Sequence, residues 1–570
     1  MTVRRVMGIE TEYGILQPGR PMANPMLLSS YVVAAHVPAL EGSRLRAKWD
    51  YDDEDPLHDA RGFRLQRASA QPSMLTDDPA RPAPSGDVAP VSSGDVAPVS
   101  SGDVAQVPGS AEPLQELARP LVDEYDDPGA ANVILTNGAR LYVDHAHPEY
   151  SSPEVTGPLD GVRWDRAGEL VMLASVRALA QNPGLPDIAL YKNNVDGKGS
   201  TYGTHENYLV ERDVPFADLA RRLIPFFVTR QVFTGAGRVG IGQRGETAGF
   251  QLSQRADYIE AEIGLETTLR RPIVNTRDEP HADPERWRRL HVILGDANLL
   301  QTATYLKLGT TSLVLWLIEQ GSRGGLAVAA LAAIDRLTLK DPVGSVHAVS
   351  HDLTLTVRLD LADGRRLTAL EIQAEYLAAV RSVLAAAPGA VPDAVPDAVP
   401  DAETADVLAR WGSLLDRLGT DPASCAREVE WLAKLRVLEG LRRRDHLAWD
   451  HPRLAAVDLQ WSDVRPERGL YQRLLEAGAV EQLVDDASAE RAAVRPPEDT
   501  RAYFRGEALA RYAGHISAAS WDSIVFDVPG APTLQRVPMR DPLRGTRDHV
   551  GALLERSPDA RSLLAALAGS

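Results

Sequence analysis

The chain has 570 residues, 44% of them hydrophobic and 25% charged, so it is long enough to form a large domain with a substantial core. Its 61 Lys and Arg residues are outnumbered by 79 Asp and Glu residues, and the formal charge of -18 argues against nucleic acid and anionic membranes as partners. The single cysteine, Cys425, excludes an internal disulfide and, together with the lack of a signal-peptide core, indicates a cytoplasmic protein.

The first predicted strand, residues 6–16, contains "VMGIETEYGI". Glu10 and Glu12 are two residues apart, so both side chains project from one face of the strand. Like charges on a partly buried strand repel each other unless a cation lies between them, and a hard ion such as Mg²⁺ takes oxygen ligands. Solvated carboxylates on an exposed edge strand are the alternative.

A long insertion at residues 42–128 follows this strand. An eight-residue unit, "SGDVAPVS" and its variant "SGDVAQVP", recurs three times in it, and the Pro, Gly and Asp content predicts a surface loop without chemistry. A second low-complexity loop, residues 387–403, repeats "AVPD" three times. The start of the insertion also carries large apolar side chains that favour docking onto a surface: Trp49, Tyr51, Leu57 and Phe63.

The next predicted strand, residues 133–145, leads into "NGARLYVDHAHPEY". Arg140, Tyr142 and Asp144 occupy alternate positions, so they share one strand face, and Glu149 follows in the adjoining turn region. An arginine fork suits phosphate, and a hard cation with an arginine and spare carboxylates describes a nucleotide phosphate site. A solvated outer face is the simpler interpretation of the alternation alone.

Two glycine-rich stretches come later in the chain. "YKNNVDGKGSTYGTHENYLV" predicts a hairpin and could also supply further ligands or substrate contacts from His205, Glu206 and Asn207. "GAGRVG", from Gly235 to Gly240, satisfies the G-x-G-x-x-G pattern, but a helix is predicted before it and none after it. A dinucleotide site needs the reverse order, so this match predicts no cofactor site.

The spacing of apolar residues along the rest of the chain indicates the fold class. Strands are predicted at residues 6–16, 133–145, 188–193, 204–210, 250–263 and 291–295, and helices at residues 160–181, 216–233, 304–319, 370–386, 404–418 and 426–442. Alternating strands with helices in later blocks predict an α+β fold, with a mostly antiparallel sheet covered by helices. We expect a large domain over residues 1–494 and a small C-terminal domain over residues 495–570.

Several blocks spread along the chain form one pattern: "MGIETEYG", "NGARLYVDHAHPEYSSPE", "YKNNVDGKGSTYGTHENYL", "GFQLSQRADYIE", "NTRDEPHAD", "RLHVILGDANL" and "TRAYFRGEAL". The pattern resembles the deamidase/depupylases of the prokaryotic ubiquitin-like protein, Pup, which have a glutamine synthetase-like fold. The resemblance implies Mg²⁺ ligation by Glu10, Tyr142 and Glu149. It implies ATP contacts from Arg140, Ser152 and Trp521, and it makes Asp144 the catalytic aspartate.

The implied activity is an ATP- and Mg²⁺-dependent amide hydrolysis that deamidates the C-terminal glutamine of Pup and releases Pup from lysines of pupylated proteins. The resemblance leaves open whether Asp144 acts as nucleophile or general base. The Pup ligase shares several of these blocks, but the short turn "HAHPEY" and the long insertion favour the depupylase. A non-catalytic protein that binds Pup or nucleotide is the other alternative. We expect a monomer.

Overall fold

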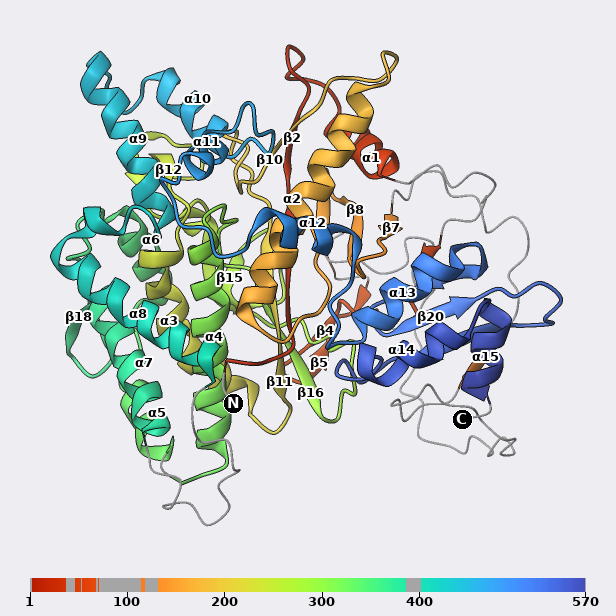
Figure 1. Cartoon of the computed structure of the whole chain (residues 1–570). Helices are drawn as coiled ribbons and strands as arrows, with labels where there is room; N and C mark the ends of the chain where they lie inside the picture. The colour runs from red at the N-terminus through yellow and green to blue at the C-terminus, as the bar shows by residue number, and fades with distance from the viewer. Residues whose placement is uncertain are drawn as a thin grey trace.

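The computed structural model describes residues 3–36, 47–52, 54–67, 70, 114–117, 132–325, 327–385 and 401–568 (Figure 1). The octapeptide repeats lie outside the described residues. The "AVPD" repeats do too, apart from Asp401, whose side chain caps the following helix by accepting from the backbone N–H of Thr404 at 2.8 Å.

Six strands form a central sheet in the order β16-β11-β1-β9-β8-β7, and every neighbouring pair is antiparallel. The mostly antiparallel sheet predicted from the sequence is therefore confirmed. The strands are β1 (Met7–Glu12), β7 (Asn132–Ile134), β8 (Arg140–Asp144), β9 (His147–Ser151), β11 (Thr204–Glu211) and β16 (Trp287–Val292).

One face of this sheet is apolar and buried. Ile9 of β1 and Tyr208 of β11 belong to the main hydrophobic core, and Leu141 of β8 belongs to a second core beside α1 (Pro25–Ala35) and α2 (Pro158–Ala180). Helix α2 begins where the sequence permits it, because Pro158 occupies the first turn directly after Gly157. The alternation of each strand therefore leaves its polar residues on the opposite face.

Helices cover the apolar face of the central sheet. In Figure 1 most of them lie at the left, and the strands of the central sheet separate them from the C-terminal helices at the right. They are α3 (Phe216–Thr234), α4 (Gln301–Ser322), α5 (Ala327–Asp335), α6 (Pro342–His351), α7 (Ala369–Leu384), α8 (Ala402–Thr420), α9 (Glu430–Asp445), α10 (Pro452–Trp461), α11 (Leu470–Glu476) and α12 (Asp486–Val494). Within the described ranges, none of the helices combines the length and apolar character needed to span a bilayer.

The C-terminal segment has a hydrophobic core and a sheet of its own. The sheet order is β3-β19-β20-β21-β6, and its two outer strands, β3 (Lys48–Trp49) and β6 (Gln115–Leu117), come from the insertion. The insertion is thus built into this sheet at both ends. The other elements are β19 (Ile516–Ala519), β20 (Ser523–Phe526), β21 (Leu534–Pro538), η6 (Ala513–His515), α13 (Ala502–Tyr512), α14 (Arg547–Arg556) and α15 (Ala560–Ala568).

Short strand pairs and 3-10 turns complete the fold. They are β2 (Gly14–Leu16) with β10 (Ala189–Tyr191), β4 (His58–Asp59) with β5 (Phe63–Arg64), β12 (Arg238–Ile241) with β13 (Thr247–Gln251), β14 (Ile259–Gly264) with β15 (Arg271–Asn275), β17 (Arg358–Asp360) with β18 (Arg366–Thr368), η4 (Ala256–Tyr258) and η5 (Pro422–Cys425).

The predicted strand at residues 250–263 is wrong as a single element. It breaks into β13, η4 and β14, because the buried carboxylate of Asp296 accepts from the backbone N–H groups of Gln254 and Arg255 and from the hydroxyl of Ser253. These backbone groups are held by a side chain distant in sequence, so they cannot join a continuous strand ladder. The strand predicted at residues 291–295 is displaced, since β16 ends at Val292.

Candidate active site

The registers of the central sheet place polar side chains from separate strands in rows on its open face. Glu12 of β1 lies opposite Glu149 of β9, which lies opposite Tyr142 of β8. The next row consists of Glu10, Ser151 and Arg140. Directly opposed residues of antiparallel strands share a face, so β8 presents its alternate polar residues to the same side as the two β1 glutamates.

Three carboxylates gather at one end of this face. Glu12, Asp144 and Glu149 each offer an oxygen, and these oxygens lie within 4.8 Å of one another. Glu149 is 1% exposed and Glu12 is 7% exposed, whereas the Asp144 side chain is 24% exposed. Asp144 is therefore the member of the group that a large substrate can reach.

The electrostatics of this group fit a bound cation. Burial raises the pKa of Glu149 well above its usual value, and the charges of Asp144 and Glu12 raise it further. Oε2 of Glu149 is also buried without a hydrogen-bond partner among the described residues. A divalent ion with oxygen ligands would relieve the repulsion and satisfy that atom, so the donor set suits Mg²⁺.

Glu12 has protein partners that keep it ionised. Burial raises its pKa, but a hydrogen bond with His147 and the charge of that imidazole outweigh burial, so the pKa falls to about 2. His147 Nδ1 lies 3.1 Å from Glu12 Oε2, and the backbone N–H of Gly203 donates to Oε1 at 2.5 Å. A negative charge is therefore permanently present beside Asp144 and Glu149.

Glu10 lies in a neighbouring group with His205 and His291, whose potential ligand atoms also lie within 4.8 Å of one another. Its Oε1 accepts from Asn207 Nδ2 at 2.8 Å, and its Oε2 lies 3.1 Å from His205 Nδ1. Burial raises the pKa of Glu10, but the hydrogen bond with His205 and the charge of Arg289 contribute to a net lowering. Glu10 is ionised and fixed in orientation.

Asp144 stands at the end of β8, where the chain makes a two-residue turn into β9. His145 has φ 52°, a left-handed conformation that is uncommon for a residue with a side chain. Its Nδ1 lies 2.9 Å from Asp144 Oδ1, and that hydrogen bond raises the pKa of His145. The turn thus places an imidazole against the exposed carboxylate.

Arg140 is held between aromatic rings. Its guanidinium carbon lies 3.9 Å from the ring centroid of Trp49 and 4.0 Å from that of Tyr142, and its Nε donates to Asn132 at 3.2 Å. Trp49 belongs to β3 of the insertion and contacts Trp521 edge-to-face, with 5.3 Å between ring centroids. The insertion therefore contributes a side chain to the site, whereas its aromatic residues predicted only docking onto a surface.

A pocket extends from Glu10 toward the C-terminal segment. The empty space in and around it amounts to about 560 Å³, part of which is open solvent, and its lining includes Gly8, Glu10, Ser152, Arg289 and Trp521. The hydroxyl of Ser152 accepts from the backbone N–H of Ile9 at 3.0 Å, which holds the chain after β9 against β1. The lining thus combines an aromatic ring with cations and carboxylates, which are features that suit a nucleotide.

The structure places Glu10, Arg140, Tyr142, Asp144 and Glu149 on one face of the central sheet, and Ser152 and Trp521 in the lining of the adjoining pocket. It divides the proposed metal ligands between two groups, with Glu149 beside Glu12 and Asp144, and Glu10 beside the two histidines. Tyr142 lies next to Glu149, and burial raises its pKa well above the usual value, so its phenol is neutral. The individual roles of these residues stay predictions.

The alternation of β11 separates the residues of "HEN". His205 and Asn207 reach Glu10, whereas Glu206 points to the opposite face and forms a buried ion pair with Arg230 at 2.6 Å. The sequence did not predict the approach of Arg289 and His291 to Glu10, or the stacking of Trp49 on Arg140. The first two lie on β16, which reaches the site only through pairing with β11.

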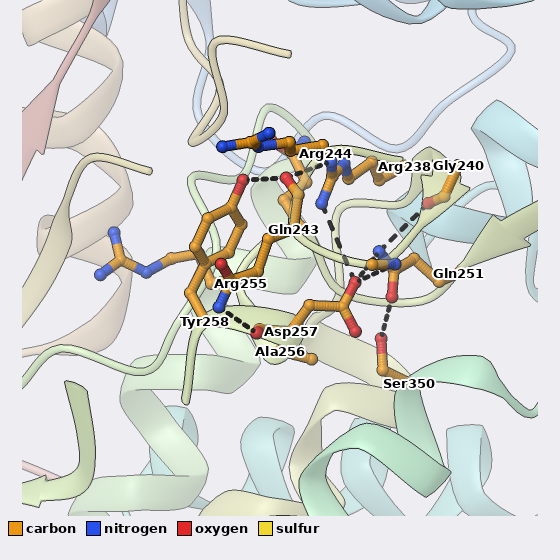
Figure 2. A network of polar contacts seen from close by, with 12 residues as sticks. Arg238, Gly240, Gln243, Arg244, Gln251, Arg255, Ala256, Asp257, Tyr258 and Ser350 are labelled. Carbon is orange, nitrogen blue, oxygen red and sulfur yellow. Dashed lines mark hydrogen bonds and ion pairs between the residues drawn. The ribbon is translucent and has the colours of Figure 1, made fainter. Parts of the chain in front are cut away.

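"GAGRVG" is a structural element, as the element order predicted. It follows α3 and runs into the β12–β13 hairpin. Figure 2 shows how side chains close that hairpin: Arg238 donates to the carbonyl of Gln243 at 3.0 Å, and Gln251 donates to the carbonyl of Gly240 at 3.2 Å and to Asp257 at 2.7 Å. Protein groups occupy this loop, and no helix N-terminus follows it to hold a phosphate.

Comparison with known sequences identifies relatives of the whole chain. A depupylase from Acidothermus cellulolyticus is 52% identical over 567 residues, covering 100% of both chains. A Pup deamidase/depupylase from Mycobacterium tuberculosis is 49% identical over 563 residues, covering 99% of this chain and 98% of the relative.

Comparison with solved structures gives the same relationship at the level of the fold. The complex of prokaryotic ubiquitin-like protein Pup with its ligase PafA matches with a TM-score of 0.69 and 28% identity, over 97% of this chain and 91% of that one. PafA in complex with ADP matches with a TM-score of 0.64 and 32% identity, over 77% of this chain and 91% of that one. The model of the Pup-ligase protein family matches residues 5–525, and the chain belongs to this family.

Proposed function

We propose that this protein is a Pup deamidase/depupylase, which hydrolyses the side-chain amide of the C-terminal residue of Pup. In one substrate that amide is the carboxamide of a glutamine, and in the other it is the isopeptide bond to a lysine of a target protein. The observation that carries the proposal is the identity of about one half, over the whole chain, with proteins that bear this name. In this proposal the protein acts as a monomer in the cytoplasm.

ATP and Mg²⁺ are the proposed cofactors. The pocket lined by Ser152 and Trp521 would hold the nucleotide, with Arg140 beside its phosphates. The solved ligase relative in complex with ADP supports nucleotide binding as such. Glu10, Tyr142 and Glu149 would hold Mg²⁺, and the partnerless oxygen of Glu149 supports a cation there. When bound, the cation supplies electrostatic stabilisation of a developing oxyanion.

Asp144 carries the chemistry in this mechanism. In one route its carboxylate attacks the γ-carbonyl carbon, the C–N bond breaks, and nitrogen leaves with a proton from solvent. Water then opens the resulting anhydride, which releases glutamate and restores Asp144. In the other route Asp144 takes a proton from water, the hydroxide attacks, and the departing nitrogen receives the proton. Both routes give the same products and consume one water and no phosphoryl group.

The residues around Asp144 orient it for either route. His145 lies 2.9 Å from one carboxylate oxygen, which limits rotation of the side chain. Glu12 is ionised, and a bound cation would also favour the ionised form of Glu149, so the cation would balance the charges beside Asp144. The nucleotide therefore organises the site in this proposal instead of being consumed at each turnover.

Ligation of Pup to lysine is the rival activity, because both solved relatives are structures of the ligase PafA. The two activities differ in their products. Pup that ends in glutamine yields ammonia with a deamidase, whereas Pup that ends in glutamate is joined to lysine by a ligase when ATP is present.

The test incubates the protein with Mg-ATP and Pup ending in glutamine, and measures ammonia. We expect ammonia release, and Asp144→Asn should lower the rate by about 10²–10⁴-fold, the range for losing a positioned base or nucleophile. Glu262→Gln, which removes an exposed carboxylate of β14, is the matched control and should retain full activity. Lysine conjugation without ammonia release would overturn the proposal in favour of a ligase.

A further inference from the structure

Arg505, in α13, links three segments of the candidate nucleotide pocket from outside that pocket. It is 0% exposed. Its Nε and Nη2 donate to the carbonyl oxygen of Gly138 at 3.0 and 2.8 Å, its Nη1 donates to the carbonyl oxygen of Trp521 at 2.8 Å, and its Nη2 donates to the carboxylate of Glu154. One guanidinium therefore holds three positions that are far apart in sequence.

Each partner of Arg505 lies at or beside a residue expected to contact nucleotide. Gly138 is in the turn that starts β8, two residues before Arg140. Glu154 follows Ser152 by two residues, and Trp521 is itself part of the pocket lining. A change at Arg505 is thus transmitted to all three contacts through very short lengths of chain.

The close approach of α13 to the β7–β8 turn depends on two glycines. Gly138 has φ +81°, and a Cβ there would lie 3.0 Å from the carbonyl oxygen of Ala502. A Cβ at Gly506 would lie 2.4 Å from the carbonyl oxygen of Thr136. Side chains at either position would separate the two segments, so both glycines allow Arg505 to reach the turn.

The contacts of Arg505 require the shape of arginine. Its planar fork presents donors in several directions at once, and its guanidinium carbon also lies 5.0 Å from the ring centroid of Trp521. A lysine ammonium could pair with Glu154 but could not also hold two carbonyl oxygens on different segments. The neighbouring Arg501 shares Glu154 at 2.7 Å and lines the pocket directly, which Arg505 does not.

We propose that Arg505 is a positioning residue for nucleotide binding, which sets the relative placement of Arg140, Ser152 and Trp521 without touching the ligand. This inference rests on the proposed function, because it takes the pocket at Trp521 to be the nucleotide site. It assigns the C-terminal domain a task in cofactor affinity and not only in folding.

The test compares ADP binding, by calorimetry with Mg²⁺ at low temperature, in the wild type, Arg505→Met and Arg505→Lys. We expect Kd for ADP to rise about tenfold or more in Arg505→Met, and by a smaller factor in Arg505→Lys, which keeps the charge paired with Glu154. In steady state the KM for ATP should rise in parallel, while kcat at saturating ATP changes less.

Arg511→Met is the matched control. Arg511 lies on the same helix and pairs with Glu507 at 3.0 Å, with a side chain that is 38% exposed, and it is not one of the pocket-lining residues. This variant should keep the wild-type Kd and KM.

Wild-type Kd for ADP in folded Arg505→Met, with a lowered melting temperature as its only change, overturns the inference and leaves a purely structural residue. If Arg505→Met does not fold, Arg505→Lys decides, and a wild-type Kd in that variant has the same meaning. Absence of ADP binding by the wild type would instead refute the proposed nucleotide site itself.

Discussion

Glu149 is a carboxylate of the candidate site that burial and neighbouring charges make costly to ionise. It is buried, it faces Glu12 and Asp144, and Oε2 has no hydrogen-bond partner within the described part of the chain. Its pKa is raised well above the usual value, first by burial and then by the neighbouring charges. In the absence of a cation, an ionised Glu149 therefore destabilises the folded state.

Glu149→Gln tests this account. Glutamine has nearly the same shape and removes one charge, so in EDTA the variant should melt at the wild-type temperature or above it. Mg²⁺ should raise the melting temperature of the wild type, and it should raise that of the variant much less, because losing a ligand weakens metal affinity by at least roughly 10–100-fold. Thermal unfolding with and without Mg²⁺ gives both comparisons.

Glu262→Gln is again the control, since it removes an exposed carboxylate that lies outside these groups. Its response to Mg²⁺ should match that of the wild type. Equal Mg²⁺ stabilisation of Glu149→Gln and the wild type would contradict a role for Glu149 in cation binding.

At the residue scale, the alternation of polar and apolar residues was sufficient to predict which side chains share a face when all of them lie on one strand. Arg140, Tyr142 and Asp144 share a face of β8 because alternate residues of any strand do. Asn207 and His291 could not be linked to Glu10 in this way, since their proximity depends on the register of β11 with β1 and β16. The pairing register between two strands cannot be deduced from the residue pattern of either strand alone.

At the scale of elements, the opening of the insertion is part of the site. Strand β3 pairs in parallel with β19, which places Trp49 over the guanidinium of Arg140 at 3.9 Å. The indole N–H donates to Glu54 at 2.9 Å, so the ring is fixed in orientation. The aromatic composition of residues 49–63 predicted docking, but its position depends on pairing with a strand about 470 residues further along the chain.

Trp49→Ala should raise the KM for ATP by about 2- to 30-fold, the factor that corresponds to the usual strength of a cation–π contact. Arg140 would keep Tyr142 as a partner at 4.0 Å, so binding should weaken and not disappear. Trp49→Phe retains a ring and should restore most of the affinity. Steady-state kinetics with varied ATP measures the effect.

The insertion contains a suitable control for this change. Phe63 of β5 lies under the guanidinium of Arg61 at 5.0 Å, but it is 48% exposed and outside the pocket lining. Phe63→Ala removes a cation–π contact of the same kind and should leave the KM for ATP unchanged. An equal rise in both variants would mean that the insertion as a whole, and not Trp49, affects nucleotide binding.

The helices of the large domain were easier to predict than its strands. Residues 216–233 and 404–418 were predicted as helices and form α3 and α8, because a long run of helical periodicity identifies a helix from sequence alone. The region after Phe250 alternates like a strand, yet the Asp296 carboxylate captures its backbone N–H groups. Tertiary hydrogen bonding of this kind leaves no local signal.

At the scale of the whole molecule, a buried ion-pair network joins the C-terminal domain to the central sheet. Glu154 follows β9, and Arg501 and Arg505 of the C-terminal segment both pair with its carboxylate. Burial raises the pKa of Glu154, but the two guanidinium charges outweigh burial and lower it from 4.5 to about 2. The interaction of Glu154 with the two arginines therefore stabilises the folded protein only while Glu154 is ionised.

The lowered pKa of Glu154 makes its ion pairs with Arg501 and Arg505 sensitive to acid. Because the pKa is lower in the folded protein than in the unfolded chain, the stabilisation is complete above pH 4.5 and is lost as the pH falls toward 2. Its size is on the order of 3 kcal/mol, from about 1.4 kcal/mol per pKa unit. Glu154→Gln should thus lower the free energy of unfolding at pH 6, and the difference from the wild type should vanish near pH 2.

Urea unfolding followed by tryptophan fluorescence between pH 2 and pH 6 measures this difference. Glu498→Gln is the matched control, because Glu498 pairs with Arg547 at 2.7 Å in the same domain but both side chains are about 60% exposed. Exposed pairs contribute little, so this variant should follow the wild-type curve at every pH. A deficit in Glu154→Gln that is independent of pH would show that packing, and not the charge of Glu154, holds the domain to the sheet.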